Sequence, residues 1–355
     1  MRRVTTYGVA IATCALMLSA CGTAADKESD DAAADCEPVT IEGDVKVGLA
    51  YDVGGQGDQS FNDAAYAGLT KAVDELGVEH TEGEAAENES EEVREERLRG
   101  FAEDGYNTIV GVGFAYSESV NKVAPDFPDV AFAVIDGFDP DEEVNCNVSY
   151  LTFAEEQGSF LVGAAAALQS ESGTIGFVGG VNNTLIQKFE AGYEAGAEAA
   201  NPDVEVISTY IEESDPKGFG DPAGGQAAAE GLYDDGADIV FHAAGGSGEG
   251  VFTAAADSGN WAIGVDSDQY LTAGDALAPS ILTSMLKRVD VATYDFIVGL
   301  TEGEFTQGFQ TFTLADDGVG YSTSGDFLTP ETIDALEEYK QQIIDGEIEV
   351  PSEVK

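Results

Sequence analysis

The sequence predicts an α/β protein built from two doubly wound lobes. Runs rich in β-branched residues alternate with segments of helical spacing, the order of elements that forms a parallel sheet covered by helices on both faces. The alternation continues over roughly 310 residues, a length that exceeds one ordinary hydrophobic core and suits two. The same series of strands and helices occurs twice along the chain. We therefore expect two sheets of similar construction.

The first strand and helix set the pattern for the rest. Residues 45–51 have the composition of a buried strand, a glycine-rich turn follows over 53–59, and apolar residues recur at helical spacing over 61–76. Ser60 stands where a helix N-cap is expected. Further strands are expected at 108–112, 130–135, 174–178, 204–210, 238–242, 261–265, 280–283 and 309–314. Further helices are expected near 91–104, 117–126, 155–169, 184–200, 222–236, 246–258, 285–302 and 330–345.

The two lobes are expected to exchange strands across a hinge that the chain crosses several times. The sequence pattern turns over near 170–173, and again near Thr283 and Glu304. The resulting assignment gives the N-terminal lobe residues 44–171 plus 284–303 and the C-terminal lobe residues 172–283 plus 304–350.

The amino terminus has the pattern of a signal peptide. Two arginines precede an apolar run over 7–17 that is too short to span a membrane. The segment Leu-Ser-Ala-Cys at 18–21 resembles the bacterial lipobox, so residues 1–20 are predicted to be removed and Cys21 to carry an acyl lipid such as palmitate. The alternative is an ordinary secretory signal that happens to end in cysteine.

The segment after the predicted cleavage site has almost nothing to bury. Residues 21–43 are rich in Ala, Asp, Glu, Ser and Thr, which predicts a lipidated, disordered tether. No other stretch approaches about 18 unbroken apolar residues, so no membrane span is expected. We expect a lipid-anchored protein on the extracytoplasmic face of the cell membrane.

The four cysteines divide into two groups. Cys14 lies in the predicted signal peptide and Cys21 at its cleavage site, which leaves Cys36 and Cys146 as a pair in an oxidising compartment. A disulfide between them is expected, and two free buried thiols are the alternative. Their spacing fits no metal ligand set, so no metal site is expected.

The chain is strongly acidic. It carries 15 Lys plus Arg against 68 Asp plus Glu, a formal net charge of −53. Nucleic acids and anionic lipid surfaces would be repelled, so neither is an expected partner. The acidity suggests either a salty habitat, where hydrated carboxylates keep a protein soluble, or simply an acidic proteome.

Polar and glycine residues gather directly after the predicted strands. These residues are Asp52, Gly113, Asp136, Gly137, Gly179, Gly180, Gly245, Gly246, Asp266 and Asp268. In open α/β sheets the carboxyl ends of the strands face the ligand crevice, so both halves of the chain should line one cleft. Glycines at these positions let backbone N–H groups approach a ligand closely.

Seven ordered blocks of sequence carry a family resemblance. They are Asp-Val-Gly-Gly-Gln-Gly-Asp-Gln-Ser-Phe-Asn at 52–62, Val-Ile-Asp-Gly at 134–137, Glu-Glu-Gln-Gly-Ser-Phe-Leu-Val-Gly at 155–163, Lys-Phe-Glu-Ala-Gly-Tyr at 188–193, Phe-His-Ala-Ala-Gly-Gly at 241–246, Gly-Val-Asp-Ser-Asp-Gln at 264–269 and Thr-Ser-Met-Leu-Lys-Arg-Val-Asp at 283–290. Together they resemble the basic membrane protein family of lipoproteins, over nearly the whole mature chain. The resemblance implies a type I periplasmic-binding-protein fold and a substrate-binding protein of an ABC importer. It also implies purine nucleosides such as guanosine, inosine or adenosine as ligands, with riboflavin or another flat heterocycle as the alternative.

The resemblance implies roles for five residues at the base of such a ligand. Phe61 and Phe189 correspond to two aromatics that sandwich the base, although helical spacing alone would make both of them core residues. Asp52, Asn62 and Asp136 correspond to positions near the base edge, where they can accept from ring N–H and amino groups. Either aspartate could instead cap a turn after its strand.

The resemblance also implies how the sugar is bound. Asp266 corresponds to an acceptor for vicinal hydroxyls and Lys287 to a donor to ribose oxygens, while Gly245 offers backbone donors. An ion pair of Lys287 with Asp290 is the alternative for the lysine. Ser60, Gly113 and Asp268 are expected to support these groups from behind, with Asp268 alternatively a simple turn residue.

The sequence gives little support to an enzyme. His80 and His242 are far apart in the chain, with no cysteine or carboxylate cluster at metal spacing. Gly-Ser-Gly-Glu-Gly at 246–250 lacks the full dinucleotide fingerprint, and neither a Gly-x-Ser-x-Gly elbow nor a phosphate loop occurs. A nucleoside-hydrolysing activity through cleft carboxylates is kept as a minor alternative, and a sensor lipoprotein without transport as another.

The expected mechanism is hinge closure around the ligand. An open state exposes the cleft, both lobes contact the small molecule, and these differential contacts favour the closed state. An ABC permease and its ATPase are the expected partners, no cofactor is expected, and a monomer is the expected state because no long heptad pattern occurs.

Overall fold

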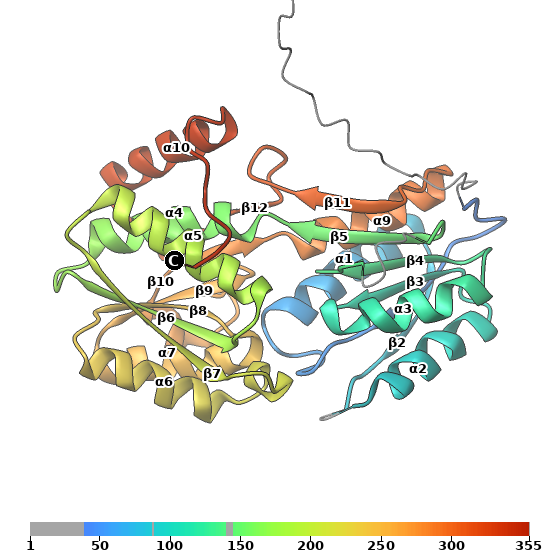
Figure 1. Ribbon diagram of the computed structural model, residues 1–355, viewed down its shortest axis with the longest axis horizontal. Helices are drawn as coiled ribbons and strands as arrows, with labels where there is room; N and C mark the ends of the chain where they lie inside the picture. The colour runs from blue at the N-terminus through green and yellow to red at the C-terminus, as the bar shows by residue number, and fades with distance from the viewer. Residues whose placement is uncertain (1–38, 87–88, 140–144, 355) are drawn as a thin grey trace, which may run out of the picture. The chain divides into compact units, whose positions relative to one another are not determined.

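The computed structural model describes residues 39–86, 89–139 and 145–354. They form two six-stranded sheets, each surrounded by helices (Figure 1). The order in the first sheet is β11 (Gly308–Phe312), β5 (Val148–Phe153), β4 (Ala131–Ile135), β3 (Thr108–Val112), β1 (Lys46–Ala50) and β2 (Glu79–Gly83). The order in the second is β12 (Val319–Tyr321), β10 (Ile281–Lys287), β9 (Trp261–Asp266), β8 (Ile239–Ala243), β6 (Thr174–Val181) and β7 (Glu205–Glu212).

The two sheets repeat one topology, which confirms the predicted pair of doubly wound α/β lobes. Every strand pairing is parallel except that of β10 with β12, which is antiparallel. In order along the chain, β1 to β4 correspond to β6 to β9. Parallel strands need helical crossovers, which is why helices cover both faces of each sheet.

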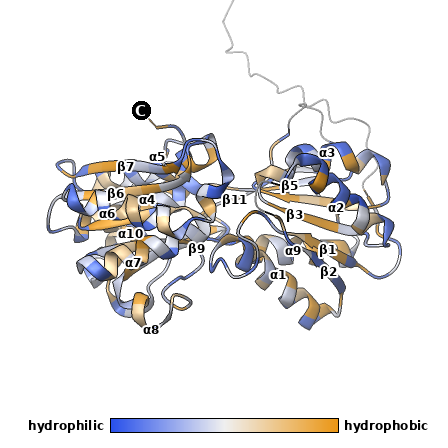
Figure 2. Ribbon diagram, turned by 90° about the horizontal axis from the view of Figure 1, so that it is seen from below, coloured by the Kyte–Doolittle hydropathy of each residue, from blue (hydrophilic) through white to orange (hydrophobic). Residues whose placement is uncertain are grey.

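The helices divide between the lobes according to the sheet they cover. The first lobe contains α1 (Phe61–Leu76), α2 (Glu91–Glu103), α3 (Ser117–Val123) and α9 (Val289–Glu302). The second contains α4 (Glu155–Gln169), α5 (Thr184–Ala200), α6 (Pro222–Asp234), α7 (Gly248–Ser258), α8 (Gly274–Leu277) and α10 (Pro330–Ile344). The central strands β3, β4 and β8 are buried along their whole length, as expected for strands covered on both faces. Figure 2 shows hydrophobic residues concentrated on the strands and hydrophilic residues on outer helices and loops.

The lobe boundaries differ from the predicted ones at three elements: α4, the end of β10 and β11. The prediction assigned 155–169 to the first lobe, but α4 packs against α5 in the second. Glycines make this packing close: a Cβ at Gly163 would stand 2.1 Å from the carbonyl oxygen of Tyr193, and one at Gly196 would stand 1.9 Å from that of Phe160. The prediction also assigned 304–350 to the second lobe, whereas β11 pairs in parallel with β5 of the first.

The chain therefore passes from one sheet to the other three times. The passages lie between β5 and α4, between β10 and α9, and between β11 and β12. The middle passage corrects a second prediction, because a strand at 280–283 followed by a helix from 285 was expected. The strand instead continues to Lys287 and the helix begins at Val289. Lys287 is thus the last residue of a buried strand.

Three strands were not predicted, each for a local reason. β2 has the polar sequence Glu-His-Thr-Glu-Gly and lies at the edge of its sheet, so it lacks an apolar run. In β5, Ser149 and Thr152 interrupt the apolar residues. β12 is only three residues long.

Several amino-terminal predictions fall outside the described residues. They concern the signal peptide, the lipidated Cys21, most of the tether and Cys36. Cys146 is disulfide-bonded, and the identity of Cys36 as its partner stays a prediction. Within the described ranges, no helix combines the length and apolarity needed to span a membrane.

Candidate functional site

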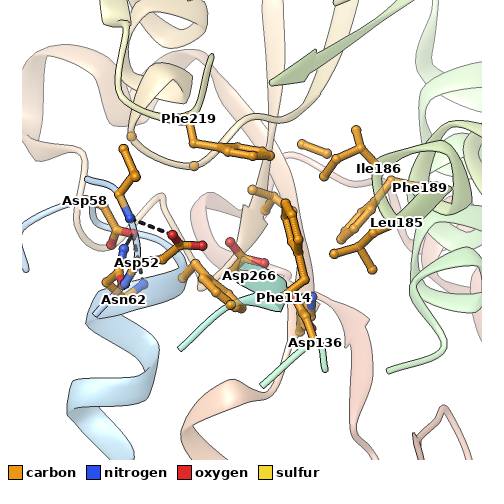
Figure 3. Close-up of a pocket in the computed structure, with 18 residues that line it drawn as sticks. Asp52, Asp58, Asn62, Phe114, Asp136, Leu185, Ile186, Phe189, Phe219 and Asp266 are labelled. Atoms are coloured by element: carbon orange, nitrogen blue, oxygen red, sulfur yellow. Dashed lines mark hydrogen bonds and ion pairs between the residues drawn. The ribbon is translucent and has the colours of Figure 1, made fainter. Parts of the chain in front are cut away.

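A pocket lies at the carboxyl ends of strands from both sheets, and Figure 3 shows the side chains around it. The space between them, including its opening to solvent, is about 570 Å³. The lining residues are Asp52, Val53, Asp58, Phe61, Asn62, Gly113, Phe114, Asp136, Leu185, Ile186, Phe189, Phe219, Ala243, Gly245, Gly246, Val265, Asp266 and Lys287. This position is the one that open α/β sheets use for ligands.

Two aspartates occupy equivalent positions in the two lobes. Asp136 directly follows β4, and Asp266 is the last residue of the corresponding strand β9. Both have left-handed backbone conformations, with φ of 60° and 65°. Few residues other than glycine adopt this conformation, and such strain concentrates at functional sites. The repeat of the fold thus delivers one carboxylate from each lobe to the pocket.

Lys287 connects the lobes at the base of the pocket. Its Nζ lies 2.6 Å from Asp136 Oδ2 and 3.2 Å from Glu155 Oε1, and all three side chains are at least 95% buried. Glu155 also pairs with Lys188, with 3.2 Å between Oε2 and Nζ. The ammonium lies 5.2 Å from the ring centre of Phe61 and 5.4 Å from that of Phe189. One buried cation is therefore surrounded by carboxylates and aromatic rings.

Burial controls the protonation of this cluster. It raises the pKa of Asp266 to about 7 and that of Asp136 to about 6, in each case against the opposing effect of Lys287. Burial alone would lower the pKa of Lys287, but the nearby carboxylates of Asp136, Glu155 and Asp266 raise it. The lysine thus stays charged while the aspartates titrate near neutral pH.

Asp52 is held by the backbone N–H of the next residue and lies against a glycine. Its Oδ1 accepts from the Val53 N–H at 2.7 Å, and burial raises the pKa of its carboxyl to about 6. A Cβ at Gly113 would stand 2.1 Å from Asp52 Oδ2, and Gly113 has a φ of 100°. Only glycine therefore leaves room for this carboxylate.

The start of α1 is organised by Asp58, which was not among the predicted site residues. Its carboxylate accepts from the backbone N–H groups of Ser60, Asn62 and Asp63 at 2.8–3.1 Å. Ser60 does occupy the predicted N-cap position, but its hydroxyl makes no cap bond and donates instead to Asp266 Oδ2 in the other lobe. Asp58 thus caps the helix, and Ser60 makes the contact with the other lobe.

Asn62 is occupied largely within the protein. Its Oδ1 accepts from the Asp52 N–H at 2.9 Å, and its Nδ2 donates to Asp58 Oδ2 at 3.0 Å. One amide hydrogen is left for a ligand. Asn62 therefore fixes the relative positions of Asp52 and Asp58 in addition to lining the pocket.

The apolar side of the pocket is larger than predicted. Besides Phe61 and Phe189, it contains Phe114 and Phe219, and Figure 3 shows the rings of Phe114, Phe189 and Phe219 directed toward the same space. Leu185 and Ile186 complete this side. Phe61 is half-buried, whereas Phe189 is 3% exposed and also packs in the main core.

The eight predicted ligand contacts and Gly113 all line this one pocket. Ser60 lies directly behind them, bound to Asp266. Asp268 does not line the pocket, and its Oδ2 accepts from Ser324 at 2.5 Å. Lys287 pairs with Asp136 and Glu155, and the alternative partner Asp290 pairs with Arg288. Which residues touch a ligand stays a prediction.

The prediction missed Phe114, Leu185, Ile186 and Phe219, and only one of these four had a sequence signal that could have identified it. Phe114 follows Gly113 after β3, so the strand-end rule could have found it. Leu185 and Ile186 have the spacing of helix core, and Phe219 lies in a short 3-10 turn after β7 with no sequence signature. Among the described residues, no group of three or more His, Cys, Asp or Glu side chains has the arrangement of a metal site.

Comparisons with known proteins agree with this geometry. The family model described as "ABC transporter substrate-binding protein PnrA-like" matches residues 45–354. A CD4+ T-cell-stimulating antigen of Listeria innocua is 34% identical, covering 95% of this chain and 94% of its own. The ABC transporter nucleoside-binding protein BmpA of Lactococcus lactis subsp. cremoris is 31% identical over 96% of this chain and 98% of its own. A crystal structure of an ABC transporter solute-binding protein from Aeropyrum pernix superimposes with a TM-score of 0.76 at 30% identity, covering 88% of this chain and 94% of that one. The fold is accordingly that of type I periplasmic-binding proteins.

Proposed function

This chain belongs to the family of PnrA-like ABC transporter substrate-binding proteins, and on that premise we propose that it captures a purine nucleoside between its lobes. The observation that carries the proposal is Asp136 Oδ1. This oxygen is buried at the pocket and accepts no hydrogen bond among the described residues. A buried carboxylate oxygen without a donor is costly, and a ligand N–H or O–H would satisfy it.

The apolar side of the pocket suits a flat heterocycle. Phe61 comes from the first lobe and Phe189 from the second, and both rings lie against Lys287. Stacking on such rings stabilises a base by about 1–3 kcal/mol per face. Asp52 and Asp136 would accept hydrogen bonds from the N–H and amino groups at the base edge.

The polar groups beside these rings suit a sugar. Asp266 would accept from the two vicinal hydroxyls of ribose, and Lys287 would donate to a ribose oxygen with the ammonium hydrogen that its two carboxylate partners leave over. Gly245 has a φ of 53° and would bring backbone groups close to the ligand.

The charge of the pocket favours a nucleoside over a nucleotide. Four aspartates line it, at positions 52, 58, 136 and 266, and Lys287 is the single cation among the lining residues. A phosphate group would meet uncompensated carboxylates in a site of low dielectric constant. The ligand is therefore uncharged and rich in hydrogen-bond donors.

We further propose the setting in which this capture operates. Closure of the lobes on the nucleoside presents the closed form to an ABC permease with its ATPase, and Cys21 carries the lipid that keeps the protein on the extracytoplasmic face of the membrane. The mass of the protein isolated from membranes tests the anchor. A native mass without diacylglycerol on Cys21 would rule the lipid out.

Calorimetric titration tests the proposed ligand. The mature protein is unfolded and refolded to remove bound molecules, then titrated with inosine, guanosine, adenosine, cytidine, riboflavin, ribose and inosine 5′-monophosphate. We expect one purine nucleoside per protein, a much weaker response to the monophosphate, and full recovery of unchanged nucleoside afterwards. Binding of riboflavin alone would overturn the nucleoside assignment, and release of free base would indicate an enzyme.

Nucleoside affinity should fall as the solution becomes more acidic. The pKa of Asp266 is raised to about 7 because the carboxyl is buried, so protonation is favoured below that pH. Protonation removes an acceptor for the ribose hydroxyls, and the apparent affinity at pH 6 should be about tenfold weaker than at pH 8. Asp266→Asn should bind weakly at both pH values and lose most of this dependence. An equal slope in native and variant proteins would assign the titration to another group.

A further inference from the structure

One buried glutamine joins the two segments that carry the pocket. Gln269 follows β9 in the second lobe, is 2% exposed and does not line the main pocket. Its backbone N–H donates to Ser284 Oγ at 3.1 Å, which fixes the start of the side chain against β10. The amide group at the other end reaches into the first lobe.

The orientation of this amide follows from its neighbours. The Val265 N–H lies 2.8 Å from Oε1 and needs an acceptor, so the oxygen faces the second lobe. Nε2 then points across the cleft and donates to the carbonyl oxygen of Gln59 at 3.1 Å. The glutamine thus accepts from one lobe and donates to the other.

His242 holds the same orientation. Its Nε2 lies 3.2 Å from Gln269 Oε1, so this nitrogen carries the hydrogen. Burial lowers the pKa of His242 to about 4, and the ring is therefore neutral at ordinary pH. The Val265 N–H and the His242 Nε2–H both face Oε1. If the amide were rotated by 180°, its NH₂ group would face these two donors and make no hydrogen bond with them.

Both ends of this contact lie next to ligand-pocket residues. Val265 precedes Asp266, and Gln59 precedes Ser60 and Phe61. Gln59 has a left-handed φ of 54°, and further cross-lobe contacts run from Ser267 Oγ to Ser60 O at 3.4 Å and from Ser60 Oγ to Asp266. The hydrogen bond between Gln269 and Gln59 therefore helps to fix the position of the Phe61 ring relative to the Asp266 carboxylate.

We propose that Gln269 is a positioning residue that latches the closed lobes and sets how long the ligand stays bound. The inference rests on the proposed function for its ligand and goes beyond it in assigning the latch. Because Gln269 does not line the main pocket and bonds across the lobes, its loss should destabilise the closed form, and a change in closure stability appears in dissociation more than in association.

Gln269→Glu is the direct test, with inosine as the probe in stopped-flow measurements. The substitution keeps an oxygen for the Val265 N–H and replaces the donor that faces Gln59 O with a second oxygen. We expect the dissociation rate constant at pH 8 to rise about tenfold or more and the association rate constant to stay within about twofold of native. Gln226→Glu is the matched control. It adds the same charge on α6, where the Gln226 amide donates to Glu230 at 2.9 Å on the surface, and should leave both constants unchanged.

The pH profile separates latching from general structural damage. A protonated glutamate carries an O–H that can donate to Gln59 O, so the ratio of variant to native dissociation rates should fall toward one between pH 8 and pH 5. The titratable groups nearby are His242, against Oε1, and Asp58 and Glu249, which line a small cavity with Gln269. Gln269→Met, which is neutral and of the same length, should show the faster dissociation at every pH. It replaces the glutamate variant if that protein fails to fold.

The outcomes distinguish the latch from the ligand assignment. Native-like dissociation in a folded Gln269 variant, or equal acceleration in Gln226→Glu, would overturn the latch. If inosine does not bind the native protein, the nucleoside proposal fails, and the latch is judged by hydrogen exchange without ligand. Faster exchange over residues 57–63 in Gln269→Glu than in native protein would then support the latch, and equal exchange would contradict it.

Discussion

Replacing Lys287 with methionine is expected to lower the free energy of unfolding by about 3–5 kcal/mol, the cost of breaking a buried ion pair from one side. The substitution leaves the carboxylates of Asp136 and Glu155 buried at 2.6 Å and 3.2 Å from where the ammonium was. Methionine fills a similar volume, so the decrease in the free energy of unfolding measures the effect of removing the positive charge. Urea denaturation at pH 8 measures it.

The pH dependence of this loss identifies its cause. The pKa of Asp136 is already raised by burial in the native protein, and removing Lys287 takes away the group that opposes the rise. The Asp136 carboxyl then protonates more readily, so the defect should shrink as the pH falls from 8 to 5. Lys122→Met removes an exposed lysine paired with Glu91 and Glu95 and should change the free energy of unfolding far less. A loss that small for Lys287→Met, or one independent of pH, would contradict the buried-cluster explanation.

Phe61→Ala should weaken nucleoside binding by about tenfold or more, because one face of the heterocycle loses its aromatic neighbour. Phe61 is half-buried at the first turn of α1, so its truncation leaves most of the core intact. Calorimetric titration with inosine gives the affinity, and thermal unfolding should show only a small change in midpoint.

Phe189→Ala gives a useful contrast to this variant. Phe189 is almost fully buried and packs in the main core, so its truncation should reduce both affinity and stability. Phe309→Ala, at a ring that is 54% exposed on β11, serves as the control and should leave nucleoside affinity unchanged. If Phe61→Ala bound inosine as tightly as native protein, the ring would be structural and the base would lie elsewhere in the pocket.

Strand-end positions were the part of the site that could be predicted from the sequence. Asp52, Asp136 and Asp266 directly follow or end buried apolar runs, and parallel strands bring such positions to one edge of a sheet. This rule uses only the order of residues along the chain, so it applies without knowledge of how the two lobes pack. The same local pattern also predicted most helices and every strand except β2, β5 and β12.

Relations between distant segments could not be predicted in this way. Glu155 begins a helix like many other glutamates, and only the folded chain brings it to Lys287, 132 residues later in sequence. Gln269 was visible only as part of a family block, because its importance lies in a contact with a backbone carbonyl 210 residues earlier. The lobe boundaries were wrong at α4 for a similar reason, since the glycines that let it pack on α5 have no meaning before the two helices are paired.

The three passages between the sheets have a consequence for how the chain is made. The first sheet lacks its edge strand until β11, at residues 308–312, is available, and the second lacks its edge strand until β12, at residues 319–321. During synthesis, neither half can be completed while the other is still emerging, and both finish within a few residues of each other. The contacts that end folding are therefore far apart in sequence, which slows folding and favours late, concerted maturation of the two halves.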